Sequence, residues 1–385
     1  MTTPPPLGVY VHWPYCARIC PYCDFNVVRD RGRKQEQAAL VVAIIADLEA
    51  QRALTGPRDM VSVFLGGGTP SLMDPAMAAE IIAAARRLWS ATVDLEVTLE
   101  ANPTDAESDR FAAFAQAGVT RLSLGLQSLD DAALAFLGRD HDAASAIRAA
   151  ERARAAFPRL SLDLIYARPG QTPEAWAAEL TEALKLGPEH VSPYQLTIES
   201  GTAFHRAVGR GRLTPPGPDL AADLYDATQD VLGAAGFEAY EVSNHARGGA
   251  ARSRHNLVYW RGEDYVGAGP GAHGRLTLDG VRTATAAFSG IGDYIAAVGA
   301  TGTGFETRQT LSPTEAAEER LLMGLRIQAG VGFAEVAALG LHASHPTVRA
   351  FVEAGLLRDH SDRLMATPAG RLLLDRLTAE LATAG

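Results

Sequence analysis

The sequence predicts an α/β protein, a partial (β/α)6 barrel followed by a small winged-helix-like α+β domain at the C-terminus. Three observations lead to this prediction. Six short β-rich runs alternate with longer helical stretches, polar side chains stand near the carboxyl ends of several runs, and the alternation stops after Thr307. We expect residues 1–245 to form the barrel core, 246–306 to form a connecting region and 307–385 to form the C-terminal domain.

The alternation is regular along the first half of the chain. The β-rich runs cover residues 8–12, 61–65, 95–99, 121–126, 161–165 and 191–198, and the helical stretches cover 35–54, 75–89, 105–117, 143–156 and 173–186. Turn-forming residues such as Gly56-Pro57 and Gly187-Pro188 separate helices from the strands that follow. This order implies parallel strands joined by crossover helices, which fits an open doubly wound sheet as well as a barrel.

The positions of polar residues favour the barrel. The sequence GGGTP directly follows the second run, Glu100 ends the third, Gln127 ends the fourth and Asp163 lies within the fifth. For any one of these residues, the solvent exposure of a strand end is enough to explain a polar side chain. Taken together, they predict an active site at the carboxyl-terminal face of a barrel. Carboxylates among apolar neighbours, as at Glu100 and Asp163, also need a bound partner, because an unpaired buried charge is costly.

The C-terminal part has a different pattern. Ser312 before Pro313 predicts a helix start, and residues 348–377 predict a helix, a short hairpin and a second helix. This pattern is typical of a winged-helix-type domain, which serves DNA binding in some proteins and protein packing in others. The net charge of −10 makes nucleic acid the weaker alternative.

The composition of the chain predicts the cellular compartment in which it works. The chain has 385 residues and only three cysteines, too few for a disulfide framework, which predicts a reducing, cytoplasmic location. The N-terminus shows no basic segment followed by an apolar one, so we expect no secretory signal. The most apolar helical stretch is too short and too charged to cross a bilayer, so we expect no stable membrane insertion.

The three cysteines lie together in CARICPYC, residues 16–23, with the spacing Cys-x3-Cys-x2-Cys. Structural zinc usually takes four ligands in pairs, and here His12 or Asp24 would have to complete the site. Three thiolates on a four-iron cubane would instead leave one iron open to a small molecule. The spacing therefore favours a [4Fe-4S] cluster held by Cys16, Cys20 and Cys23.

The motifs CARICPYC and GGGTP resemble those of the radical S-adenosylmethionine (SAM) superfamily. The resemblance implies that the three cysteines hold a [4Fe-4S] cluster whose open iron binds SAM. By position, it also implies SAM contacts from Tyr10, Gly67, Gly68, Thr69, Glu100, Gln127, Arg139 and Asp163. Tyr22, beside Cys23, is expected to form an aromatic wall for adenine, although a packing role explains it equally well.

Within the superfamily, the chain is most similar to the oxygen-independent coproporphyrinogen III oxidase group, through YVHWPYC, FLGGGTPSLM, LEANP, RLSLGLQS and SPYQLTIE. It departs from the oxidases at Phe25, where they carry a further cysteine, and in its shorter N-terminal arm. The segment RHNLVYW, residues 254–260, resembles the HNxxYW motif of the HemW branch, described as heme chaperones. The resemblance implies heme binding, with His255 as the expected iron ligand and His245 and His273 as rivals. A structural role for His255 is the alternative.

Two functions follow from these resemblances. The first is a heme chaperone that carries a SAM-ligated cluster, receives electrons from a donor protein and delivers heme to an acceptor protein. The second is a radical SAM oxidase that acts on a tetrapyrrole. The departures from the oxidase pattern favour the first function, and the intact cluster and SAM motifs keep the second one open.

Overall fold

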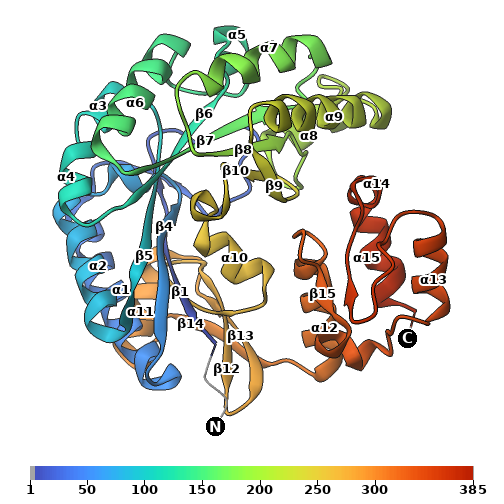
Figure 1. The fold of residues 1–385 in the computed structure, drawn as a ribbon. Coiled ribbons are helices and arrows are strands. Elements are labelled where there is room, and N and C mark those ends of the chain that lie inside the picture. The colour runs from blue at the N-terminus through green and yellow to red at the C-terminus, as the bar shows by residue number, and fades with distance from the viewer. Residues whose placement is uncertain (1–4, 385) are drawn as a thin grey trace.

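The computed structural model describes residues 5–384, and its central element is one curved sheet (Figure 1). Six strands of this sheet run parallel in the order β1-β4-β5-β6-β7-β8. They are β1 (Leu7–Trp13), β4 (Asp59–Gly67), β5 (Ser90–Ala101), β6 (Arg121–Gln127), β7 (Arg159–Tyr166) and β8 (His190–Gln195). Each of these strands overlaps one of the six predicted runs, although β5 begins five residues earlier than predicted and β8 ends three residues earlier, and the sheet order does not close on itself. The predicted partial barrel is therefore confirmed.

Helices cover the outer face of the parallel strands, as Figure 1 shows. Asp74, Asp142 and Thr172 each begin one of these helices by accepting a hydrogen bond from a backbone amide in its first turn. The crossover helices are α1 (Lys34–Thr55), α2 (Pro75–Leu88), α4 (Phe111–Gln116), α6 (Ala143–Ala156) and α7 (Pro173–Leu184).

The helix expected over residues 105–117 forms instead as two short helices, α3 (Asp105–Ser108) and α4. The buried carboxylate of Glu107 accepts a hydrogen bond from the amide of Asn102 at 3.0 Å. This bond joins the first short helix to the loop after β5, and residues 109–110 form a turn before α4 begins. A further short helix, α5 (Asp131–Phe136), was not apparent from the sequence.

Further strands extend the sheet at both ends. Strands β10 (Asn244–Ala246) and β9 (Glu238–Glu241) follow β8 in antiparallel pairing. At the other end, β11 (Asp264–Ala268) runs parallel to β1, and β12 (His273–Leu278), β13 (Val281–Ala287) and β14 (Phe305–Thr310) continue from it in antiparallel pairing. Val266 of β11 pairs with Val9 of β1, and both belong to one hydrophobic core. Residues 246–306 thus extend the barrel sheet, rather than only connecting two units as expected.

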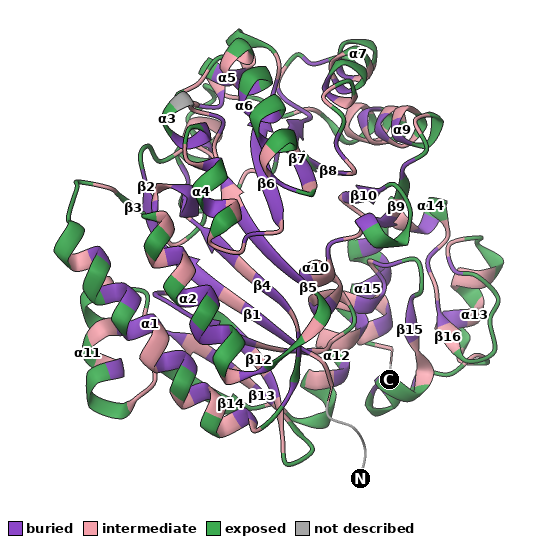
Figure 2. Ribbon diagram, turned by 60° about the vertical axis from the view of Figure 1, so that its left-hand side comes forward, coloured by how far each residue is buried: buried purple, intermediate pink, exposed green. Residues whose placement is uncertain are grey.

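The parallel strands are buried on both faces, as is usual where helices cover a parallel sheet. In β6, residues 121–126 are all buried, although successive side chains point to opposite faces of the sheet. In β1, Val9 is fully buried and pairs with Val63 of the neighbouring strand. Figure 2 shows this contrast: the strands of the barrel are buried, while the helices expose their outer surfaces. This rigid sheet fixes the positions of the side chains at its carboxyl ends.

The C-terminal part forms a second core around Leu321, Val336 and Leu364. Its elements are α12 (Pro313–Gly324), β15 (Val331–Gly332), a 3-10 helix (Phe333–Leu339), α13 (Pro346–Glu353), β16 (Arg363–Leu364), α14 (Pro368–Arg371) and α15 (Leu374–Ala382). The predicted start of α12 is present, because Ser312 and Glu315 form a reciprocal capping box. The antiparallel pair β15–β16, with helices around it, agrees with the winged-helix-like prediction.

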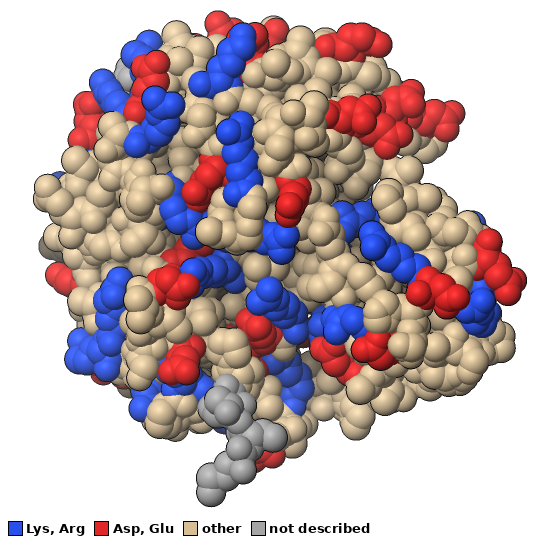
Figure 3. Space-filling view, viewed as in Figure 1, with Lys and Arg blue, Asp and Glu red and all other residues tan. Residues whose placement is uncertain are grey.

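The surface view in Figure 3 shows basic and acidic side chains interspersed over this face of the molecule. On helix α9 (Pro218–Ala234), acidic residues recur at Asp219, Asp223, Asp226 and Asp230. Within the described residues, none of the helices is both long and apolar enough to span a membrane.

Candidate functional site

The three cysteines lie on one loop above the carboxyl end of β1. Cys16 ends the short strand β2 (Tyr15–Cys16), which pairs with β3 (Val28–Arg29) and so closes the loop at its base. Cys20 and Cys23 lie within the loop, and the amide of Cys23 donates to the carbonyl of Cys20 at 3.2 Å. All three thiols are free of disulfides and line the same cavity, which has a volume of about 960 Å³.

The zinc alternative is not supported by this geometry. Nδ1 of His12 lies 2.8 Å from the hydroxyl of Tyr10, and Nε2 lies 2.8 Å from the carbonyl oxygen of Asn26. Both ring nitrogens of His12, one of the two candidate fourth ligands, are therefore engaged, whereas the other candidate, Asp24, lines the cavity with the cysteines. In the described part of the chain, no group of three or more His, Cys, Asp or Glu side chains could hold a single metal ion. Three thiols that share one cavity fit a cubane with one open iron.

The glycine-rich segment lies against the cysteine loop. The amide of Gly68 donates to the carbonyl of Trp13 at 2.7 Å, and the amide of Thr69 donates to the carbonyl of Tyr15 at 2.8 Å. A side chain at Gly68 would place its Cβ 2.7 Å from the backbone oxygen of Tyr15. Gly67 also adopts a φ of +108°, which disfavours any other residue there. These glycines allow the backbone to approach the cluster loop closely.

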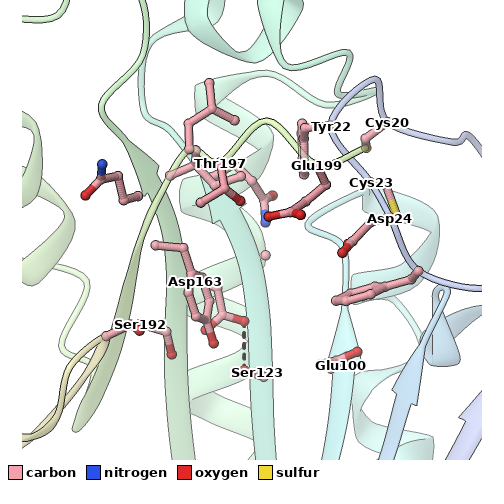
Figure 4. Close-up of a pocket in the computed structure, with 18 of the residues that line it drawn as sticks. Cys20, Tyr22, Cys23, Asp24, Glu100, Ser123, Asp163, Ser192, Thr197 and Glu199 are labelled. Carbon is pink, nitrogen blue, oxygen red and sulfur yellow. Dashed lines mark hydrogen bonds between the residues drawn. The ribbon is translucent and has the colours of Figure 1, made fainter. Parts of the chain in front are cut away.

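Two carboxylates from different strands point into the cavity, as Figure 4 shows for Glu100 and Asp163. The amide of Gly67 donates to Oε2 of Glu100 at 3.1 Å. Burial, followed by the negative charge of Asp163, raises the pKa of Glu100 to about 8. Such a carboxylate is ready to ionise when a cationic ligand arrives.

Asp163 is held from both sides by hydroxyl groups. Ser123 donates to its Oδ2 at 2.8 Å, and Ser161 donates to its Oδ1 at 3.4 Å. Burial raises the pKa of Asp163 despite these bonds and the nearby charge of Arg121. The floor of the cavity is thus preorganised for amines and hydroxyls.

Arg139 links the cysteine loop to the strand ends. Its Nη1 donates to Sγ of Cys20 at 3.4 Å, and its Nη2 donates to Oδ1 of Asn102 and, at 3.3 Å, to the carbonyl of Gly125. Asn102 in turn donates to Oγ1 of Thr69 at 3.0 Å. Sequence reasoning missed Asn102, although it lies in the LEANP segment, two residues after Glu100.

Gln127 occupies an unusual backbone position beside this network. Its φ of +56° lies in the left-handed region, which is strained for a residue other than glycine. Its buried Oε1 finds no hydrogen-bond partner among the described residues. Gln127 lines the cavity, so this acceptor is available to a ligand.

Comparisons with known proteins agree with this geometry. A family model described as the radical SAM superfamily matches residues 10–183, and one described as the HemN C-terminal domain matches residues 311–373. The chain is 37% identical to the heme chaperone HemW of Mycobacterium tuberculosis, covering 98% of this chain and 95% of that protein. It is 34% identical to the heme chaperone HemW of Bacillus subtilis, with coverage of 95% and 96%. The chain belongs to the HemW branch of the radical SAM superfamily.

Two further comparisons concern a mitochondrial relative and a solved structure. The chain is 40% identical to the mitochondrial radical S-adenosyl methionine domain-containing protein 1 of Bos taurus, covering 97% of this chain and 87% of that protein. The solved structure of coproporphyrinogen III oxidase (HemN) from Escherichia coli superposes with a TM-score of 0.80 at 20% identity, covering 99% and 91% of the two chains. At this identity, the second likeness concerns the fold.

The structure brings most of the expected family residues together in one cavity. Those that line it are Cys16, Cys20, Tyr22, Cys23, Gly67, Gly68, Thr69, Glu100, Gln127, Arg139 and Asp163. Tyr22 also packs against Phe204, with ring centroids 6.3 Å apart, so it has a packing role. Tyr10 is the exception, because it lines a second cavity behind the cysteine loop.

His255, the expected heme ligand, is buried and has a partner at each ring nitrogen. It is 1% exposed, its Nδ1 lies 2.8 Å from Oγ of Ser62, and its Nε2 lies 2.6 Å from the hydroxyl of Tyr259. Its ring also stacks on Phe64 at 4.9 Å between centroids. An axial ligand needs a free ring nitrogen that faces a cavity. The structure therefore favours the alternative, a structural role for His255.

The rival histidines differ from each other. His245 is 1% exposed, and its Nε2 lies 3.2 Å from Oε1 of Gln229 within the protein interior. His273 begins β12, is exposed, and lines the second cavity together with Tyr10.

The C-terminal domain contributes residues to the main cavity that sequence reasoning did not anticipate. Arg326, Leu372, Leu373 and Arg376 line it from the side opposite the barrel. Leu372 and Leu373 are each 46% exposed. No sequence signal connects this segment with the cysteine loop, because their proximity arises only from the packing of the two cores.

Proposed function

We propose that this chain is a heme chaperone that binds a [4Fe-4S] cluster, SAM and heme, and delivers heme to an acceptor protein. The observation that carries the proposal is the meeting of three free cysteines, the glycine-rich segment and the carboxylates Glu100 and Asp163 on one cavity. Relatives that bear the name heme chaperone HemW match this chain over nearly its whole length, which supports heme as the molecule that it carries.

The residues have separable tasks in this proposal. Cys16, Cys20 and Cys23 would hold three irons of the cluster, and the cluster would supply one electron. Glu100 and Asp163 would bind the cationic and hydroxyl groups of SAM. Arg139 would donate hydrogen bonds to a carboxylate while remaining close to Cys20, since its guanidinium has several donors in a fixed geometry.

A radical SAM oxidase remains the second candidate, because the cluster and SAM residues suit either function. Phe25 argues against it by resemblance, since the oxidases carry a cysteine at that position. The side chain of Phe25 is 60% exposed at the cavity wall, and it is apolar where an oxidase would place a thiol.

One experiment separates the two functions. The cluster-loaded protein is incubated without oxygen with coproporphyrinogen III, SAM and dithionite, and the products are analysed by chromatography. The same preparation is titrated with heme. Heme binding without formation of protoporphyrinogen supports the chaperone, whereas protoporphyrinogen formation would overturn it.

The remaining parts of the proposal concern the partner proteins and the cellular compartment. An electron donor for the cluster and a protein acceptor for heme follow from the proposed cycle. The free thiols support a reducing compartment, and we propose the cytoplasm. The Bos taurus relative bears the name of a mitochondrial protein.

A further inference from the structure

A second cavity, of about 390 Å³, lies behind the cysteine loop. Four parts of the chain form it: β1 and the cysteine loop, helix α10 (Arg254–Trp260), the sheet extension and helix α12. Its lining consists of Tyr10, His12, Phe25, Asn26, Tyr259, Trp260, Tyr265, Gly271, His273, Arg282, Glu319 and Met323. Phe25 also lines the main cavity, so this one side chain stands between the two.

The lining is suited to a flat aromatic molecule. Phe25, Tyr259, Trp260 and Tyr265 contribute rings, and the rings of Tyr259 and Tyr265 meet edge to face with centroids 4.5 Å apart. Aromatic walls with a few polar groups are typical of sites for planar ligands. The half-buried Met323 adds a flexible apolar side chain from the C-terminal domain.

His273 is the side chain in this lining that offers a free iron ligand. No hydrogen bond involves its ring in the part of the chain that the structure describes, whereas both ring nitrogens of His12 are engaged. Partial burial and then the charge of Arg275 lower the pKa of His273. Tyr265 is a weaker candidate, because a phenol binds iron as phenolate and burial raises the pKa of Tyr265.

We propose that this second cavity is the heme site of the chain, with His273 as the axial ligand of the iron and Phe25 and Trp260 as cover for the macrocycle. This inference rests on the proposed function, because it identifies where the cargo of the chaperone binds. It assigns the ligand to β12 and not to the HNLVYW segment.

The same geometry explains the HNLVYW segment. His255 lies 2.6 Å from the hydroxyl of Tyr259 and holds that ring at the cavity wall. Trp260 lies at the end of the same helix and also lines the cavity. The segment therefore builds the aromatic wall, while its histidine acts from the interior as a positioning residue.

The charged side chains of the lining suggest how heme is oriented. The guanidinium of Arg282 is paired with Asp264 at 2.7 Å, and Glu319 is paired with Arg275 at 2.8 Å. These pairs leave no uncompensated positive charge inside the cavity for a propionate. We therefore expect the apolar edge of the macrocycle to point inward and the propionates to reach solvent near the exposed His273.

The test is a heme titration of protein whose cluster is already built, because free cysteines also bind heme. The variants are His273→Ala and Phe25→Ala, both at exposed positions, with His205→Ala as a control at an exposed histidine of α8 (Ala203–Gly209). We expect the parent and His205→Ala to bind about one heme per chain. His273→Ala should bind at least about tenfold more weakly with a shifted Soret band, and Phe25→Ala should bind more weakly with an unchanged ligand spectrum.

A rescue experiment distinguishes the loss of an iron ligand from a local change in structure. Imidazole added to the His273→Gly variant should restore the Soret position of the parent, because the free base can occupy the vacated ligand position. If the parent binds heme and His273→Ala binds it with the same affinity and spectrum, the assignment of the site is overturned. If the parent itself binds no heme, the proposed chaperone function fails instead.

Discussion

The backbone amide of Gly67 donates a hydrogen bond to Oε2 of Glu100 at 3.1 Å, which joins the glycine-rich segment after β4 to the end of β5. This bond fixes the carboxylate in the cavity that the cysteines line. Burial, followed by the negative charge of Asp163, raises the pKa of Glu100 and disfavours its charged form, so a cationic ligand would stabilise the carboxylate. The pair is therefore a direct point at which to test the proposed SAM site.

Glu100→Gln should weaken SAM binding without affecting cluster assembly. The amide keeps the shape of the side chain and an acceptor for Gly67, but it removes the negative charge. Loss of one charged hydrogen bond costs about 1.5–3 kcal/mol, or roughly ten- to hundredfold in affinity. Calorimetric titration of the cluster-loaded variant with SAM measures this change, and the iron content confirms that the cluster is intact.

The matched control is Glu199→Gln, which removes an exposed carboxylate from the rim of the same cavity. Its SAM affinity should stay close to that of the parent. Equal losses in both variants would indicate a general electrostatic effect, and an unchanged affinity in Glu100→Gln would remove Glu100 from the site.

SAM affinity should also rise with pH. Burial and the charge of Asp163 raise the pKa of Glu100 to about 8, so the carboxyl is mostly neutral at pH 7 and mostly ionised at pH 9. The ionised form attracts the sulfonium of SAM, and binding should therefore tighten as the pH rises through 8. Titrations across this range should show the effect in the parent and a flatter curve in Glu100→Gln. A curve of the same slope in both proteins would contradict the assignment.

The cluster prediction depends on the scarcity of thiols. Anaerobically reconstituted protein should contain about four irons per chain. Cys16→Ala, Cys20→Ala and Cys23→Ala should each abolish the cluster, because the chain contains only three cysteines and no spare ligand. Iron and sulfide analysis, together with the visible spectrum, measures the result. A colourless protein with one tightly bound zinc would refute the cluster.

Much of the fold and of the main cavity could be predicted from the sequence because the signals are local. The strand runs, the cap at Ser312 and the cysteine spacing each depend on residues that are close in the chain. The contribution of Leu373 and the location of His273 could not be predicted in this way. Both depend on long-range packing, which brings α12 and the C-terminal domain against the barrel.

The HNLVYW segment contains a second position that could not be predicted from local sequence. A histidine beside Tyr259 and Trp260 suggests a heme ligand, but the sequence does not show which way its ring points. In α10 the ring turns inward, and Ser62, from a strand distant in sequence, meets its Nδ1. A buried histidine with two partners fits a structural role, and this interpretation leads to a separate prediction.

His255→Ala should destabilise the protein before any heme is added. The hydroxyls of Ser62 and Tyr259 would each lose a buried partner, and the lost ring would leave a cavity beside Phe64. Together these effects should lower the free energy of unfolding by about 2–4 kcal/mol. Urea unfolding followed by tryptophan fluorescence measures the change, and the exposed-site variant His205→Ala should lie within about 0.5 kcal/mol of the parent.

The pH dependence of the same variant supplies a second check. Burial lowers the pKa of His255 to about 3, well below its ordinary value of 6.5. The folded state therefore resists protonation that the unfolded chain accepts, so the contribution of His255 to stability is complete above pH 6.5 and decreases as the pH falls toward 3. The gap in stability between parent and His255→Ala should narrow over this range. If His255 were a heme ligand with a free nitrogen, the heme-free variant would be as stable as the parent at every pH.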